Sequence, residues 1–224
     1  MARTARLAIV AGFVVAAALG AFFAVRTLLW DPPTVAFTAN SSGQVNVAFQ
    51  TVGSYGSGDH PTWVSYLMRS PTTGKWVHTT IWQVPAHTRI NVTIYQYDSG
   101  SPLRNQQIGQ VQGTIGGTAK LNGTTFKVNN SNVGNGVAHT FSIPVLGISV
   151  PLAGNGPSAN LCAAAPCSVT NTSYAHNIVT FSFMSPGPGS YPWQCFVPCG
   201  LGWLYGNGGP MSTVGYMSGF MKVV

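Results

Sequence analysis

The segment Asn91-Val-Thr-Ile-Tyr-Gln-Tyr97 indicates the class of fold, because its residues alternate as they do along a β-strand. Val92 and Ile94 lie on one side of such a strand, and Thr93 and Tyr95 lie on the other. β-Branched and aromatic residues occupy both sides, so we expect both faces of this strand to be at least partly covered.

Segments of similar composition recur along the chain, and clusters of Gly, Pro, Asn and Ser separate them. The sequence contains 27 glycines and 15 prolines, and no stretch beyond the N-terminal segment shows a long helical period. Short strands with such turns are typical of a sandwich or a barrel, so the predicted fold is all-β. The predicted strands are Val35–Phe37, Val45–Phe49, Trp63–Met68, Trp76–Trp82, Ile90–Tyr97, Thr125–Val128, Thr140–Val145, Ile178–Phe183, Tyr191–Cys195 and Phe220–Val224.

The chain is unusually poor in charge. Charged residues make up 6% of it, against about 25% in a typical soluble domain, and the acidic residues are Asp31, Asp59 and Asp98. The net charge is +7, but the basic residues of the main part are scattered and form no cluster of the kind that binds nucleic acid. With so few acids, no Gly-x-Ser-x-Gly motif and no zinc-type histidine cluster, a hydrolytic enzyme is disfavoured.

The N-terminus carries an uncharged run, Leu7–Val25, of 19 residues, preceded by Arg3 and Arg6. About 20 apolar residues span a bilayer, whereas the core of a signal peptide usually has 7–15. Length therefore favours a retained anchor, although the small residues in the run leave cleavage open. The excess of arginine before the run indicates that the rest lies outside. We expect a single-pass protein of the cell membrane, with an anchor at 1–29 and an extracytoplasmic domain at 30–224.

The four cysteines fall into two pairs. Cys162 and Cys167 bracket the turn-like sequence Ala-Ala-Ala-Pro, and outside the cytoplasm this spacing favours a local disulfide. Cys195 and Cys199 are separated by three residues and could form a second disulfide or hold a metal.

Three stretches within residues 137–224 carry a resemblance to a known family. They are Ala138–Pro151 (AHTFSIPVLGISVP), Pro188–Gly200 (PGSYPWQCFVPCG) and Tyr216–Val224 (YMSGFMKVV). In this order and spacing they resemble the copper-binding domain of cytochrome c oxidase subunit II. That family has a His-Ser-Phe strand, a Pro-Gly-x-Tyr strand leading into Gln-Cys-x-Glu-x-Cys-Gly, and a terminal Met-x-Gly-x-x-x-Val strand.

The resemblance implies a cupredoxin-like Greek-key β-sandwich that binds copper. It implies one ligand on an early strand, His139, and the others on the loop between the last two strands, Cys195, Cys199 and Met217. The carbonyl of Val197 occupies the position of the glutamate carbonyl in the family. Imidazole, thiolate and thioether groups are ligands that suit copper.

The sequence also departs from the family. A second histidine follows the second cysteine there, but the corresponding positions here hold Trp203 or Val214, and no histidine follows His176. A dinuclear copper centre of the family type therefore lacks a ligand. His176 and Met211 are weaker candidate ligands. The remaining histidines are expected to be exposed: His60, His78 and His87.

We therefore expect a membrane-anchored cupredoxin-like protein for copper binding and electron transfer, acting as a subunit or partner of a respiratory terminal oxidase or another redox protein. It is not expected to be an enzyme on its own. Two alternatives stay open. One is a metal-free structural subunit whose relict copper loop is closed by a Cys195–Cys199 disulfide, and the other is a Cu(I) delivery protein.

Overall fold

The structure, a computed structural model, describes two units of the chain, a helix and a β-sandwich. Helix α1 (Arg3–Leu28) contains Leu7–Val25, which is long and apolar enough to cross a membrane, a test that a secretion signal near an N-terminus also passes. The described residues are 3–28, 31–56, 61–156, 159–170, 173–200 and 208–224.

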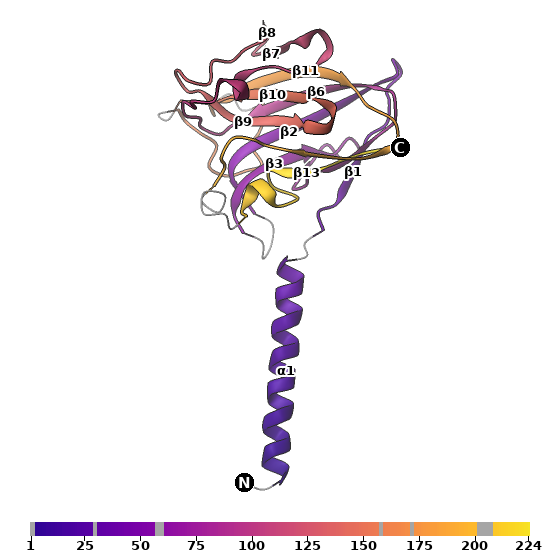
Figure 1. Cartoon of the computed structure of the whole chain (residues 1–224), viewed down its shortest axis with the longest axis vertical. Coiled ribbons are helices and arrows are strands. Elements are labelled where there is room, and N and C mark those ends of the chain that lie inside the picture. The colour runs from indigo at the N-terminus through magenta and orange to yellow at the C-terminus, as the bar shows by residue number, and fades with distance from the viewer. Residues whose placement is uncertain (1–2, 29–30, 57–60, 157–158, 171–172, 201–207) are drawn as a thin grey trace. The chain divides into compact units, whose positions relative to one another are not determined.

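Two sheets form the sandwich (Figure 1). The six-stranded sheet has the order β1-β5-β13-β12-β9-β10, and the seven-stranded sheet has the order β4-β3-β2-β6-β11-β7-β8. The first sheet contains β1 (Thr34–Ala36), β5 (Ile81–Val84), β9 (Val137–Ile143), β10 (Ile148–Ala153), β12 (Gly189–Gln194) and β13 (Ser218–Val223). The second contains β2 (Gln44–Tyr55), β3 (Trp63–Arg69), β4 (Trp76–Val77), β6 (Arg89–Gln96), β7 (Ala119–Leu121), β8 (Thr124–Phe126) and β11 (Asn177–Met184).

Both sheets contribute large side chains to one hydrophobic core. Phe49 of the seven-stranded sheet meets Trp82, Phe141 and Trp193 of the six-stranded sheet at ring distances of 5.5 to 5.8 Å. Residues 31–136, which precede the stretches that carry the resemblance, supply strands to both sheets and so extend the same sandwich. The prediction of an all-β sandwich is confirmed.

One predicted strand, Trp76–Trp82, is wrong as a single element. Its first part is β4, which pairs with β3, and its last part belongs to β5, which pairs with β1 and β13 of the other sheet. The chain crosses between the sheets at Thr79 and Thr80, which are both fully buried. The Thr79 hydroxyl donates to the Pro33 carbonyl at 2.6 Å, and the Thr80 hydroxyl accepts from the Gly215 N–H at 2.6 Å. These distant partners satisfy the buried polar groups that the crossing requires.

Strand β10 was not predicted, and its sequence explains why. Pro151 lies inside it, and a proline argues against a central strand because it has no N–H to donate. The structure accommodates the proline because β10 is the edge strand of its sheet. It pairs with β9, and on its other side it makes an isolated bridge from Ser149 to Gln112.

Cys162 and Cys167 form a disulfide with an S–S distance of 2.04 Å, the pairing that their spacing favoured. Cys167 is buried in a small cluster with Tyr97, separate from the main core. The buried side chain of Gln50 accepts from the Cys167 N–H at 2.9 Å and donates to the Cys167 carbonyl. The disulfide loop is thereby fixed to strand β2.

Candidate metal centre

Strand β9 positions His139. All seven residues of the strand are buried, and His139 is 2% exposed. Because side chains alternate along a strand, His139 shares a face with Phe141, whose ring packs against Phe181 of the opposite sheet at 5.3 Å. The imidazole therefore lies on the inner side of the six-stranded sheet.

The end of strand β12 brings the first cysteine to the same place. Gln194, the last residue of β12, pairs with Ser142 of β9, and Cys195 follows it directly. The Thr140 N–H lies 3.4 Å from the Cys195 sulfur and donates to it. The N–H of Cys195 donates to the carbonyl of Met217 at 2.9 Å, so the start of the loop is fastened to the segment that leads into β13.

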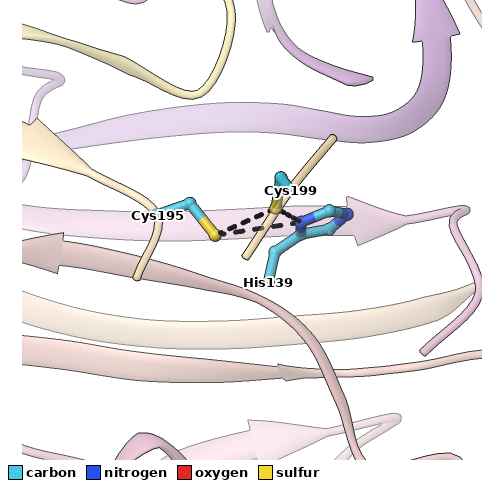
Figure 2. Close-up of side chains that lie close together, drawn as sticks. All are labelled: His139, Cys195 and Cys199. Carbon is cyan, nitrogen blue, oxygen red and sulfur yellow. Dashed lines mark hydrogen bonds between the residues drawn. The ribbon is translucent and has the colours of Figure 1, made fainter. Parts of the chain in front are cut away.

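The three predicted ligand atoms of His139, Cys195 and Cys199 converge (Figure 2). Nδ1 of His139 lies 3.2 Å from the Cys199 sulfur and 3.9 Å from the Cys195 sulfur, and the two sulfurs are 3.6 Å apart. The circle through three points with these separations has a radius of about 2.1 Å, which matches the 2.0–2.3 Å bonds that nitrogen and sulfur ligands make to a metal ion. The donor set therefore fits a single soft or borderline metal ion in both spacing and chemistry.

The sulfurs of Cys195 and Cys199 are not bonded to each other. Their separation of 3.6 Å is well beyond the 2.05 Å of a disulfide, and both are free, buried cysteines. The relict-loop alternative requires a disulfide here, and the structure does not contain it.

Asp98 completes the surroundings of His139, and the sequence interpretation did not identify it. It follows β6 in the seven-stranded sheet, and its Oδ2 lies 3.1 Å from Nε2 of His139. The side chain of Asp98 is 22% exposed, whereas that of His139 is 3% exposed. The contact therefore joins the two sheets at the candidate site.

Burial and hydrogen bonds shift the pKa values of His139 and Asp98 in opposite directions. Burial lowers the pKa of His139, but the hydrogen bonds to Asp98 and Cys195 and the negative charges of both outweigh it and raise the pKa to about 9. Burial raises the pKa of Asp98, yet the hydrogen bond and charge of His139 hold that pKa below its ordinary value. The carboxylate therefore accepts, and the Nε2–H of His139 donates.

The two cysteines titrate in opposite directions. Burial raises the pKa of Cys195, but hydrogen bonds from Cys199 and His139 and the charge of His139 lower it well below its usual range. The hydrogen bond to Cys195, together with burial, raises the pKa of Cys199. Cys195 is thus the thiolate of the pair, and a thiolate is the form of cysteine that binds metal.

A pocket of about 440 Å³ reaches the cluster from one side. His139, Cys199 and Asp98 line it, together with Trp63 and Pro210. Cys195, in contrast, is fully buried. The cluster is therefore approached through His139 and Cys199.

Two further polar groups lie near the cluster, the carbonyl of Val197 and the hydroxyl of Tyr66. The carbonyl of Val197 lies 3.6 Å from the Cys195 sulfur, on the short loop where the resemblance placed a carbonyl ligand. The Tyr66 hydroxyl donates to the Thr140 carbonyl at 2.9 Å, beside the strand position that carries His139. Burial, with the nearby Cys195 and Cys199, raises the pKa of Tyr66, so the phenol stays neutral.

Both candidate methionines are buried in the main core. Met217 is fully buried and Met211 is 6% exposed, and the core that contains them also includes Cys195 and Cys199. Met217 contributes its backbone carbonyl to Cys195, as described above. A role for the Met217 thioether as a ligand stays a prediction.

None of the other histidines among the described residues belongs to the three-residue cluster. His176 stacks on Tyr97 at 5.0 Å, and its Nδ1 contacts the Tyr174 carbonyl. His87 is exposed, as predicted, whereas His60 lies outside the described residues. The prediction of an exposed His78 is wrong.

His78 is buried because its ring packs edge-on against two tyrosines, Tyr55 at 4.9 Å and Tyr216 at 4.8 Å. It lies where the chain leaves β4 to cross to the other sheet. Of the two positions that replace the second histidine of the family, Val214 bridges to Ser218, and Trp203 lies outside the described residues.

Fold and cluster together define a two-sheet β-sandwich with a His–Cys–Cys group on strand β9 and on the loop after β12. Solved structures with a similar fold include rusticyanin from Thiobacillus ferrooxidans, 16% identical, with 85% of this chain and 82% of that chain covered and a TM-score of 0.35. Reduced rusticyanin is also 16% identical, with 85% and 84% covered and a TM-score of 0.35. A methionine-to-leucine variant of rusticyanin is 15% identical, with 87% and 84% covered and a TM-score of 0.37.

Rusticyanin is described as a copper protein. No family model and no curated protein matches this chain.

Proposed function

We propose that this chain is an electron-transfer protein that binds one copper ion through Nδ1 of His139 and the sulfurs of Cys195 and Cys199. The observation that carries the proposal is the convergence of these three atoms at separations suited to one metal ion. Copper bound there would supply a one-electron couple. The protein's own part is to hold the donors on strand β9 and on the loop that follows its neighbour β12, which limits their movement when the charge of the metal changes.

Burial favours electron transfer over copper delivery. A delivery site has to release its metal to a partner, which requires ligands that the partner can reach. Here the exposed fractions of His139, Cys195 and Cys199 are 2%, 0% and 6%. The Cys195 sulfur also accepts a backbone hydrogen bond from Thr140, which holds the thiolate in place.

Copper loading of the full-length chain in detergent tests this function. We expect about one copper per chain and, in the oxidised form, visible absorption from charge transfer between thiolate and copper. Metal analysis and an optical spectrum measure both. His87→Asn is a suitable control, because His87 is exposed and has a φ of 50°, a conformation that asparagine tolerates.

The alternatives give different results in the same experiment. A relict loop predicts no bound copper and a Cys195–Cys199 disulfide in the native protein, found by mapping under non-reducing conditions. A delivery protein predicts Cu(I) that passes within seconds to a competing chelator. Either result would replace electron transfer as the function.

We also propose that α1 is a retained membrane anchor and that the sandwich lies outside the membrane, where a respiratory oxidase or another membrane-bound redox protein is its partner. The apolar run Leu7–Val25 supports an anchor, and the arginines before it support this orientation. Protease added to intact cells or spheroplasts should digest the sandwich and leave the N-terminus protected. Complete protection of the sandwich would contradict the orientation.

A further inference from the structure

The position of Asp98 is notable because acidic residues are so scarce. The chain contains three, and Asp98 is the only one after Asp59. It lies against His139, 41 residues away in the sequence, although Asp98 follows β6 of the seven-stranded sheet and His139 is on β9 of the six-stranded sheet. A sequence that has almost no carboxylates elsewhere thus carries one in direct contact with a candidate metal ligand.

The backbone of Asp98 is held firmly. Its N–H donates to Oε1 of Gln96 at 2.8 Å, and its carbonyl accepts from Nε2 of Gln96 at 2.8 Å. The same carbonyl also accepts from the backbone N–H and the side chain of Asn155, at 3.1 and 3.0 Å. Gln96 and Asn155 are themselves buried. Two buried amides therefore fix the point from which the carboxylate extends.

The carboxylate is constrained as well. Oδ1 of Asp98 accepts from the Ser99 N–H at 2.8 Å, which leaves Oδ2 directed at His139. Gly53 lies beside it, and a Cβ at that position would approach Oδ1 to 2.9 Å. The absence of a side chain at Gly53 provides the space that the carboxylate occupies.

We infer that Asp98 is the positioning residue of the metal centre. By accepting the Nε2–H of His139 it keeps a proton on Nε2 and orients the ring so that Nδ1 faces the two sulfurs, which leaves Nδ1 as the nitrogen that gives up its proton when a metal binds. A histidine ligand usually donates its second N–H to such a partner, and loss of the partner weakens metal binding. The inference rests on the proposed function, because it assigns the role of Asp98 at that same site.

A purely structural role is the competing explanation, since the Asp98–His139 contact also ties the two sheets together. The test therefore combines an affinity with a measurement on the imidazole itself. Competition with a Cu(I) chelator gives the affinity of the full-length chain, and ¹⁵N-resolved NMR of the histidine rings reports the Nε2–H of His139 with and without Cu(I). Asp31→Asn is the matched control, because Asp31 is exposed and the chemical change is the same.

Asp98→Asn should weaken Cu(I) binding by about 10- to 100-fold, while Asp31→Asn should leave it unchanged. The Nε2–H resonance of His139 should lose its low-field position and its protection from exchange in Asp98→Asn. Gly53→Ala keeps the charge but displaces the carboxylate, so it should produce a smaller loss, and it should add nothing in the Asp98→Asn background.

The possible results distinguish a failure of the proposed copper-binding function from a failure of the positioning role of Asp98. If the wild type binds no Cu(I), the proposed function fails, and the imidazole resonance of the metal-free protein still decides whether Asp98 orients His139. If the wild type binds Cu(I) but Asp98→Asn binds equally well with an unchanged Nε2–H resonance, the positioning role is wrong. A variant that only lowers the unfolding temperature, with affinity and resonance intact, supports the structural explanation instead.

Discussion

Cys195→Ser should abolish copper binding and the visible absorption together. Cys195 is the thiolate of the cluster and is fully buried. Its sulfur lies 3.9 Å from Nδ1 of His139 and 3.6 Å from the Cys199 sulfur. A serine hydroxyl is neutral at this site and is a poor ligand for copper, so one nitrogen and one sulfur would be left. His139→Ala should weaken binding strongly for the same reason. Metal content and the optical spectrum after loading are the measurements.

The other cysteine pair supplies the control. Replacing Cys162 and Cys167 by alanine removes two sulfurs, one more than Cys195→Ser removes, but their disulfide lies outside the ligand cluster, in the group of residues around Tyr97. Copper content and spectrum should therefore stay as in the wild type. If Cys195→Ser retained a full copper equivalent and its absorption, the metal would be bound elsewhere and the proposed centre would be wrong.

Much of the sandwich could be predicted because its strands carry local signals. The alternation in Asn91–Tyr97 corresponds to β6, where inner residues such as Val92 are buried and outer ones such as Thr93 are half-buried. The division of Trp76–Trp82 between two sheets could not be predicted. The threonines that permit it are satisfied by residues far along the chain, at Pro33 and Gly215, and no local pattern encodes such partners.

The candidate site could likewise be predicted only in part. His139, Cys195 and Cys199 belong to ordered motifs, so their positions could be predicted, and the structure brings them together. Asp98 belongs to no motif. Its contact with His139 depends on how the two sheets face each other, which a strand pattern does not specify. The available signal was compositional, since an isolated acid in a chain with three is a candidate for a specific role.

A single substitution in the hydrophobic core next to the site should also have a large effect, on the free energy of unfolding. Phe141 is fully buried and lies two residues after His139 on β9, with its ring 5.0 Å from Trp193 and 5.3 Å from Phe181. Phe141→Ala removes these contacts and leaves a cavity, which typically costs about 3–5 kcal/mol in a core. Since a domain has only about 5–15 kcal/mol of stability, the free energy of unfolding should fall by a large fraction.

Phe220→Ala is the matched control for this prediction, because Phe220 is 36% exposed and lies on β13 of the same sheet. The same truncation there should cost about 1 kcal/mol or less. Denaturant unfolding of both variants, followed by tryptophan fluorescence, measures the difference. Phe141→Ala should also weaken Cu(I) binding, because β9 carries both Phe141 and His139 and the cavity lets that strand shift relative to Cys195. An equal and small loss of stability in both variants would mean that Phe141 does not anchor the strand that carries His139.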